Sequence, residues 1–436
     1  MSRGAGPAAA LAATASLVGV GVLAPVGVPA VALVAARNTA RTNRRIPAVV
    51  EALGRLADGA DAAGPFDHVR RLPAGTPVVV TSDLHRCIAG ANDWPRRQGT
   101  AAIYDVALDH YGAAGWHLVE DGDVEDLWMV GGSTRGAAYG LGRLGAALLP
   151  GRVGRATRTR LRRRQLRAIV EHNVGTYRRI EQRFHRHGRY HRVVGNHDDV
   201  LADPAVADEL RLVHAGLEVL DAVVVDRPGG PGAVITHGHH TDAWNAPDMA
   251  ALGRLGTWLA CHVRDVPLLG LDPGLADEQA SRRLLGGHQL DRLTAVSRWF
   301  GANLEQYSMD EVRLFDAAGR RWPSVTDPDG ADDPVLVLGH THLPLASPTA
   351  PDGRRWWRYL NSGSGVASKL VTAVELDGVG SPRLVAWGRP DDLPPHLADL
   401  EPTAADAQGC PVVRVELGPD ADGSHLVAEA VVVAGG

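Results

Sequence analysis

The stretch PVVVTSDLHR, residues 77–86, joins a short apolar run to two side chains of metal-binding type, Asp83 and His85. Apolar, β-branched residues followed by a turn predict a buried β-strand over Pro77–Thr81. The same pattern predicts further strands over His117–Glu120, His191–Val194, Ala233–Thr236 and Val335–Leu338. Side chains just past the carboxyl ends of strands in open α/β sheets face a common crevice. The sequence therefore predicts an α/β fold with such a crevice.

Polar residues follow each of the five predicted strands. They are Asp83-Leu-His85, Gly122-Asp123, Gly195-Asn196-His197-Asp198, His237-Gly-His239 and Gly339-His340-Thr-His342. Aspartate, asparagine and histidine side chains gathered in one crevice have the composition of a dinuclear metal site. Metal-dependent chemistry is therefore the first functional hypothesis.

The five motifs resemble, in type and in order, those of the calcineurin-like metallophosphoesterase superfamily, which are D-x-H, GD-x-x-D, GNH-D/E, H and G-H-x-H. The second motif reads Gly122-Asp123-Val-Glu-Asp126 and matches the longer form of the family pattern. The resemblance covers about residues 77–366. It implies a four-layer α/β/β/α sandwich, with two mixed sheets flanked by helices. It also implies a phosphoric ester hydrolase.

The resemblance assigns each ligand to one of two metals. It implies that Asp123 bridges both metals, that the first is bound by Asp83, His85 and His342, and that the second is bound by Asn196, His237 and His340. Two such cations hold a phosphate ester and lower the pKa of a bridging water, so that hydroxide attacks in line. Oxygen and imidazole ligands without thiolate favour two divalent ions of Mn, Fe or Zn over Ca²⁺, with Mn²⁺ the first expectation.

The resemblance makes His197 the general acid, which protonates the leaving oxygen and does not bind metal. Asp198 is expected to orient the ring of His197 and to raise its pKa. His239 and Asp242 closely follow the ligand His237. Both are expected to orient imidazoles, and contact with substrate is the alternative for His239.

Two residues beside His85 leave alternatives open. Arg86 suits either a substrate phosphate or a surface salt bridge. Cys87 suits a buried structural cysteine better than a thiolate ligand. The chain has three cysteines, too few and too widely spaced for a disulfide framework.

The N-terminal residues 4–36 carry no charge and are rich in alanine, valine, leucine and glycine. This length exceeds the roughly 20 apolar residues that span a membrane, although Pro25 and Pro29 interrupt a helix. Four arginines follow within residues 37–45, and a positive flank on this side favours a cytoplasmic catalytic domain. We expect a membrane-associated protein, with export after signal cleavage near Ala36, or a disordered extension, as the alternatives.

The chain divides into three parts. Residues 1–36 form the anchor or signal segment, 37–72 a linker and N-terminal helix, and 73–436 the catalytic domain. Insertions at about 131–165 and 241–333 leave from strand ends that carry motif residues. They predict a lid or substrate wall, with peripheral packing as the alternative.

The periodic apolar residues of Leu166–Phe184 predict one long helical stripe that packs on the sheet carrying Asn196. After the last motif, further strands are predicted and are expected to form the second sheet of the sandwich. They are Trp356–Leu360, Leu370–Leu376, Arg383–Trp387, Pro411–Leu417 and Leu426–Val433.

The net charge of −5 hides two opposite regions. Residues 151–192 contain fourteen arginines against two glutamates, a balance of +12, and residues 391–436 contain nine acids against Arg414, a balance of −8. The basic region predicts either a solvated helix face paired with acids or contact with an anionic membrane surface or substrate. Few aromatic residues interleave with its arginines, which argues against nucleic acid as a partner.

The apolar N-terminus, basic insert and lid resemble those of the UDP-2,3-diacylglucosamine pyrophosphatases, membrane-surface members of the same superfamily. Those enzymes usually carry arginine at the position of His197 and aspartate at that of His239. A phosphoesterase acting on a small-molecule or lipid-like phosphoester is therefore the main expectation. The alternative is a membrane-surface pyrophosphatase acting on a lipid-linked or nucleotide-linked diphosphate. An inactive scaffold is disfavoured because no ligand is missing.

Overall fold

The structure is a computed structural model. It describes residues 33–34, 36–90, 93–128, 142, 151–242, 245–247, 249–250, 253–254, 257, 314, 317–322, 325–329, 334–349, 353–366, 369–378, 382–393, 400–419 and 426–429. Nearly all of the predicted anchor and much of both predicted insertions lie outside these residues. None of the helices in the described part of the chain has the length and apolar character of a membrane span.

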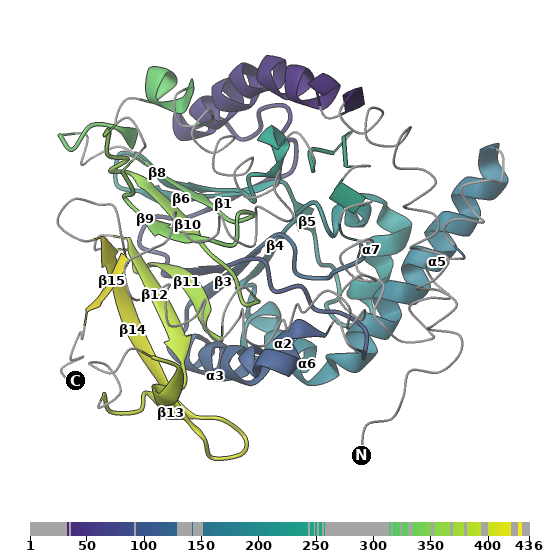
Figure 1. Cartoon of the computed structure of the whole chain (residues 1–436), viewed down its shortest axis with the longest axis vertical. Coiled ribbons are helices and arrows are strands. Elements are labelled where there is room, and N and C mark those ends of the chain that lie inside the picture. Colours follow the sequence, from purple (N-terminus) through teal and green to yellow (C-terminus); the bar gives the residue numbers. More distant parts are fainter. Residues whose placement is uncertain are drawn as a thin grey trace.

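The strands of the described residues form two mixed sheets (Figure 1). The larger sheet has the order β13-β14-β12-β11-β2-β3-β4-β5, with β15 paired to β14. Its strands are β2 (Val78–Thr81), β3 (His117–Asp121), β4 (Tyr190–Val193), β5 (Val219–Leu220), β11 (Val371–Leu376), β12 (Arg383–Gly388), β13 (Ala404–Ala405), β14 (Pro411–Pro419) and β15 (Leu426–Glu429). The smaller sheet has the order β1-β6-β7-β8-β10-β9. Its strands are β1 (Val69–Leu72), β6 (Ala222–Arg227), β7 (Gly230–Ile235), β8 (Val335–Leu338), β9 (Pro344–Ala346) and β10 (Tyr359–Ser362).

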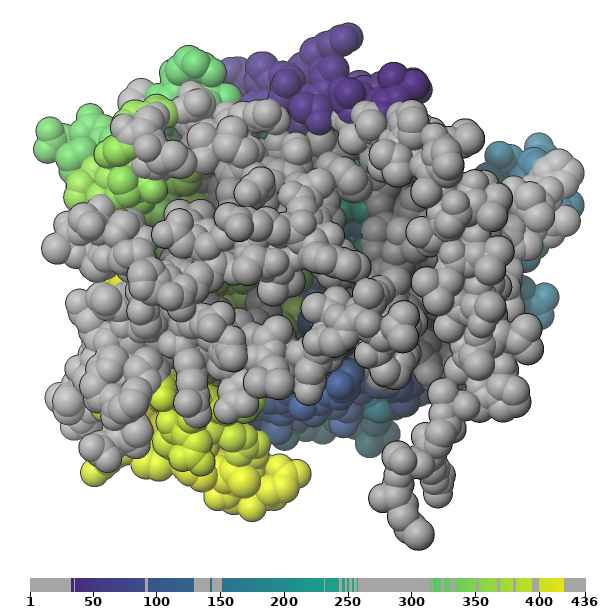
Figure 2. Space-filling model, in the orientation of Figure 1, coloured from purple at the N-terminus to yellow at the C-terminus, as the bar shows by residue number. Residues whose placement is uncertain are grey.

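Helices accompany both sheets, so the predicted α/β class with two mixed sheets is confirmed. The α-helices are α2 (Trp94–Gln98), α3 (Thr100–Ala113), α5 (Gly151–His172), α6 (Val174–Arg183) and α7 (Pro204–Arg211), with a further helix over residues 36–57. Short 3-10 turns are η1 (His185–His187), η2 (Asp199–Ala202), η3 (His239–Thr241) and η6 (Pro390–Asp392). In Figure 2 the helix over 36–57 (purple) and the yellow β13–β14 region lie at opposite edges of the molecule.

The alternation of side chains along each strand fills three apolar cores. In β2, Val78 and Val80 point into the core between the sheets, whereas Val79 points into the core beneath α3 and α6. In β8, Val335 and Val337 point between the sheets, and Leu336 faces the helix over 36–57. Successive side chains of a strand point in opposite directions, and each of these strands has an apolar core on both sides. Both of its faces are therefore buried, which explains the continuous apolar sequence.

The long helical stripe predicted over Leu166–Phe184 is broken into α5 and α6 at Asn173. The side-chain amide of Asn173 donates to the carbonyl oxygens of Cys87, at 3.2 Å, and Ile169, at 2.9 Å. Both helices pack as predicted on the sheet that carries β4, through Leu166, Ile169, Tyr177, Ile180 and Phe184. Val174, which the stripe includes, is 38% exposed and does not join this core.

The strands after the last motif were predicted to form the second sheet, and this is wrong for most of them. Of the strands predicted there, only the first, observed as β10, joins the smaller sheet, together with the short strand β9 that was not predicted. β11 pairs antiparallel with β2, placing Val374 opposite Val80, so β11, β12 and β14 extend the larger sheet. As a result, the five motif strands are divided, with β2, β3 and β4 in the larger sheet and β7 and β8 in the smaller one.

Several arginines of the basic region are paired with acids, as one of the two predictions for this region states. Arg163 and Arg167 bind Glu209 of α7, and Arg179 binds Asp105 and Asp109 of α3. The side chains of Arg179, Asp105 and Asp109 are partly exposed, so their pairs contribute little to stability, whereas Glu209 is buried beneath its two arginines. Contact with an anionic membrane surface stays a prediction.

Candidate metal centre

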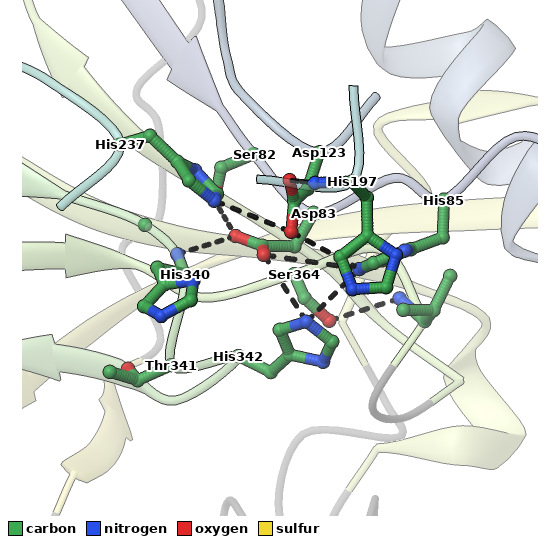
Figure 3. Close-up of polar contacts among 12 residues, drawn as sticks. Ser82, Asp83, His85, Asp123, His197, His237, His340, Thr341, His342 and Ser364 are labelled. Atoms are coloured by element: carbon green, nitrogen blue, oxygen red, sulfur yellow. Dashed lines mark hydrogen bonds and ion pairs between the residues drawn. The ribbon is translucent and has the colours of Figure 1, made fainter. Parts of the chain in front are cut away.

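Six of the seven predicted ligands come together in one place, with Asp83 near the centre of the labelled side chains in Figure 3. Three groups of side chains in this region offer ligand atoms that lie within 4.8 Å of one another: Asp83, His85 and His342; Asp123, His237 and His340; and His85, Asp126 and His197. The first is the set that the sequence assigned to the first metal. The second joins two ligands assigned to the second metal with Asp123. A site able to hold metal is therefore present, as predicted.

The first group has the spacing of a coordination shell. Nε2 of His342 lies 3.2 Å from Oδ1 of Asp83 and 3.1 Å from Nε2 of His85. Ligand atoms bound at about 2.0–2.2 Å to one tetrahedral ion lie roughly 3.3 Å apart. Only small adjustments would therefore let these three residues bind one cation.

Asp123 belongs to the group with His237 and also faces the group that contains His85. Its Oδ2 is 3.4 Å from Nε2 of His237 in the second group and 4.0 Å from Nε2 of His85 in the first. Its Oδ1 accepts a hydrogen bond of 2.7 Å from the backbone N–H of His197, which fixes the carboxylate. One oxygen facing both groups is the arrangement that a bridging ligand requires.

The tautomers of two imidazoles are set by their outer nitrogens. Nδ1 of His237 donates to the carbonyl oxygen of Asp121 at 2.7 Å, and Nδ1 of His85 contacts Oδ2 of Asp126 at 2.9 Å. Nε2 of each ring consequently faces the centre. Such hydrogen bonds orient metal-binding histidines and raise their basicity. His340 is held from its Nε2 by Asp242 at 2.9 Å, so the role predicted for Asp242 is confirmed.

Asn196 is the seventh predicted ligand, and its role stays a prediction. It is buried, with 2% exposure, and follows β4 directly after the motif glycine. Among the described residues, the ligand atoms Oδ1 of Asp83, Oδ1 of Asn196 and Nε2 of His237 are buried without a hydrogen bond. A buried polar atom left so costs about 1–3 kcal/mol. Two bound cations, one in each predicted ligand set, would satisfy all three.

The backbone at the site is strained in a way that points to function. Asp83, His85, Asp123, His340 and His342 have φ values of 52°, 43°, 52°, 69° and 60°, in the left-handed region. In the described part of the chain only Ser347 joins them among residues other than glycine. Each such conformation costs about 1–3 kcal/mol and is kept where side chains must take a fixed direction.

The motif glycines let the ligand loops approach one another closely. A Cβ atom at Gly122 would lie 2.4 Å from Cγ of His237, and one at Gly195 would lie 2.2 Å from Oδ1 of Asp123. A Cβ atom at Gly339 would lie 2.5 Å from the hydroxyl of Ser82. Any side chain at these positions would push a ligand out of place.

We expect Gly195→Ala to bind less metal and to melt at a lower temperature than the wild type. The added methyl group displaces Asp123, and overpacking of this kind costs about 1–3 kcal/mol. Metal content and thermal unfolding measure both effects. Gly175→Ala is the matched control, since a Cβ atom there meets nothing within 4 Å and alanine favours its helix. Equal metal content in the two variants would contradict the close approach.

His197 lies beside the ligands with a carboxylate of its own. Its Nδ1 is 3.0 Å from Oδ1 of Asp126, and its ring stacks on that of Trp128 with 4.4 Å between centroids. Burial lowers the pKa of His197, but the charges of Asp126 and Asp123 outweigh burial and raise the pKa to about 9. The ring is therefore protonated at neutral pH when no cation is bound.

The role predicted for Asp198, orienting His197, belongs to Asp126. Asp198 is buried, and its carboxylate accepts hydrogen bonds from the backbone N–H groups of Gly195, at 2.6 Å, and Val124, at 2.9 Å. It also forms a salt bridge with Arg192. Asp198 thus ties two ligand loops together, and its effect on the pKa of His197 is smaller than that of Asp126.

The carboxylates give the centre a strong preference for positive charge. Burial lowers the pKa of His237, but Asp123 and Asp83 outweigh it and raise the pKa to about 10. Burial, with the charges of Asp83 and Asp123, raises the pKa of Asp121 to about 8, although His237 opposes the shift. A metal cation would replace the proton on His237, so that binding releases a proton.

Two further predictions are corrected by burial. His239 is 2% exposed and packs 4.3 Å from His240 between ring centroids, so it cannot contact substrate from the surface. Arg86 is 4% exposed and forms a buried salt bridge with Glu120, so neither a substrate contact nor a surface salt bridge is correct. Cys87 is fully buried in the core beneath α3, as predicted for a structural cysteine.

Sequence reasoning missed the polar network behind the ligand loops. Glu120 accepts hydrogen bonds from the hydroxyls of Tyr104, at 2.7 Å, and Tyr190, at 2.6 Å. Glu125 accepts one of 2.6 Å from Tyr177 and contacts Arg192 at 2.7 Å. The acidic run Glu120–Asp126 after an apolar strand was the available signal. Its glutamates contact tyrosines and arginines of the core, whereas Asp123 and Asp126 contact histidines of the metal centre, which only the backbone path reveals.

Comparisons with known proteins add no relative. No protein-family model matches the chain, and a search of curated proteins finds no match. The candidate metal centre therefore rests on its geometry and on the motifs.

Proposed function

We propose that the protein is a dinuclear-metal-dependent phosphoric ester hydrolase with a calcineurin-like fold. The position of Asp123 carries the proposal, because one oxygen faces His237 at 3.4 Å and His85 at 4.0 Å while an imidazole with its own carboxylate stands beside it. A structural metal site needs no such acid. A site for hydrolysis does, because a leaving oxygen must gain a proton.

Two divalent cations, when bound, would neutralise the oxygens of a phosphate ester and lower the pKa of water. The chain's own residues supply the rest. Asp123 and the imidazoles would bind the cations. Asp198 accepts hydrogen bonds from two of the loops that carry these side chains and so fixes the loops relative to each other. His197 is held through Nδ1 by Asp126, which leaves Nε2 as the nitrogen that donates a proton to the leaving oxygen.

The donor set supports Mn²⁺, Fe or Zn²⁺, and we propose Mn²⁺ first. The test is hydrolysis of p-nitrophenyl phosphate and of its diester by full-length protein stripped with a chelator and then supplied with single metals. Activity that returns with Mn²⁺, together with close to two equivalents bound at the crevice, supports the proposal. Metal-independent turnover, or no turnover with any of these ions and substrates, would count against it.

A diphosphate is the second candidate substrate, favoured by positive charge near His197. The guanidinium of Arg254 lies 5.2 Å over the ring of Trp128, which stacks on His197, and it forms an ion pair with Asp199. Arg162 lies close enough to affect the same carboxylate. These two arginines would attract a second phosphate in the leaving group. A lipid-linked diphosphate would also suit the proposed membrane-associated, cytoplasmic location.

We expect Arg254→Ala to lower the ratio of diphosphate to monoester turnover by roughly tenfold or more, since a charge-assisted contact contributes about 1.5–3 kcal/mol. Arg211→Ala is the control, because Arg211 is a partly exposed arginine paired with Asp208 of its own helix. A nucleoside diphosphate sugar and p-nitrophenyl phosphate are suitable substrates. An unchanged ratio would leave only the monoester and diester hypotheses.

A further inference from the structure

A separate cluster of metal-binding side chains lies away from the candidate metal centre. Glu181, His185 and His214 offer ligand atoms within 4.8 Å of one another. Glu181 lies in the last turn of α6, His185 begins η1, and His214 follows α7. These segments lead into the amino ends of the parallel strands β4 and β5. The crevice lies past the carboxyl end of β4, so the two clusters lie at opposite ends of that strand.

The cluster is centred on one carboxylate oxygen. Oε2 of Glu181 lies 2.9 Å from Nδ1 of His185 and 3.1 Å from Nδ1 of His214. The two imidazole centroids are 5.2 Å apart. Ligand atoms around a tetrahedral ion bound at about 2.0–2.2 Å lie roughly 3.3 Å apart. The distances from Glu181 therefore need only a small increase to admit a cation.

The surroundings hold these side chains ready for a metal. The side chain of His214 is fully buried, and its ring lies 5.2 Å from that of Tyr190 and 5.9 Å from that of Tyr177. Burial keeps the pKa of His214 below its usual value, so the imidazole is neutral, as metal binding requires. The side chains of Glu181 and His185 are 20% and 17% exposed, which leaves an entry path.

The charges around Glu181 and His185 also affect whether a cation can bind there. The carboxyl end of a helix carries partial negative charge and attracts cations. Glu181 lies in the last turn of α6, and His185 follows that helix at the start of η1. Arg186 contacts the other oxygen of Glu181 at 3.3 Å and would repel a cation. Its side chain is 64% exposed, so it can turn into solvent without breaking core packing.

We propose that Glu181, His185 and His214 form a separate site for one divalent transition-metal ion of the Zn²⁺ type, which ties the chain before β4 to the chain before β5. Two imidazoles and one carboxylate, with one position open to water, are a donor set that Zn²⁺ commonly takes. The ion would lie outside the hydrolytic centre. It would hold the amino ends of two neighbouring strands, one of which carries Asn196 at its other end.

The test uses the full-length chain with Asp123→Asn, so that the crevice is already altered in every sample. Each protein is equilibrated with Zn²⁺, freed of unbound metal and assayed for metal content. We expect His185→Ala to bind one equivalent less than its parent. His187→Ala, which changes an exposed histidine of the same 3-10 turn, is the matched control and should bind as much as the parent.

Co²⁺ provides a spectroscopic readout that does not depend on activity. The parent should show the visible absorption of tetrahedral cobalt from this cluster, and both His185→Ala and Glu181→Gln should lose it. Glu181→Gln keeps the size of the side chain, so it covers the case in which His185→Ala fails to fold. Metal content and Co²⁺ spectra that are the same in the parent and both variants would overturn the proposal, whatever the outcome at the crevice.

Discussion

The Asp123→Asn variant is expected to lose roughly three orders of magnitude or more in kcat/KM for p-nitrophenyl phosphate with added Mn²⁺. Oδ2 of Asp123 faces both ligand groups, and an amide offers neither the charge nor a second accepting oxygen. Burial raises the pKa of Asp123, but His237 and His197 outweigh it and hold the pKa well below its usual value, so the charge is present at neutral pH.

The same variant separates loss of chemistry from loss of fold. Asparagine is close in size to aspartate, so thermal unfolding in the absence of metal should change little compared with the loss of rate. Asp208→Asn is a matched control, because Asp208 is an exposed aspartate paired with Arg211 on α7. Turnover by Asp123→Asn at the wild-type rate would show that this centre does not carry the hydrolysis.

The His197→Ala variant is expected to keep both metals and to lose roughly 10²–10⁴-fold in rate. His197 is the proposed proton donor, and its Nδ1 contacts Asp126, which together with His85 and His197 forms a group that could also hold a cation, so metal analysis of this variant decides between the two roles. The loss should shrink for substrates whose leaving group is stable as an anion, since such a group needs no proton. Metal analysis and rates across a series of aryl phosphates measure the two effects.

Asp126→Asn sharpens this test. Asp126 holds His197 at 3.0 Å and His85 at 2.9 Å, so its loss should impair both proton donation and the orientation of one ligand. His68→Ala removes the imidazole of an exposed histidine and is the control for His197→Ala. Loss of metal from His197→Ala would contradict the role assigned to that residue.

The parts of the site that the sequence predicted are those that depend on residues close together in the chain. Asp83 and His85 follow β2 directly, and the apolar run before them fixes both the strand and the direction of the turn. The same holds after β3, β4, β7 and β8. Parallel pairing brings the carboxyl ends of β2, β3 and β4 to one edge of the larger sheet and those of β7 and β8 to one edge of the smaller. Local pattern therefore places the ligands within each sheet, whereas the packing of the two sheets brings the two sets together.

The parts that the sequence missed depend on contacts between distant segments. Asp198 was assigned to His197 because the two are neighbours in the chain, yet the carboxylate of Asp198 turns toward Arg192 and two backbone amides. Asp126 reaches His197 instead, from a loop after a different strand. The position of β11 beside β2 and the burial of Arg86 against Glu120 likewise depend on pairing across the fold.

The division of the ligands between two sheets has a consequence for the life of the protein. Asp83 and His85 follow a strand of the larger sheet, whereas His342 follows a strand of the smaller one. Any cation that joins them is therefore also a cross-link between the layers. Its binding free energy adds to the stabilisation from the apolar core between the two sheets. Starvation for metal would then do more than halt turnover. It would weaken the packing between the two sheets and expose their valine-rich faces to proteases. The supply of metal would therefore govern the amount of intact protein.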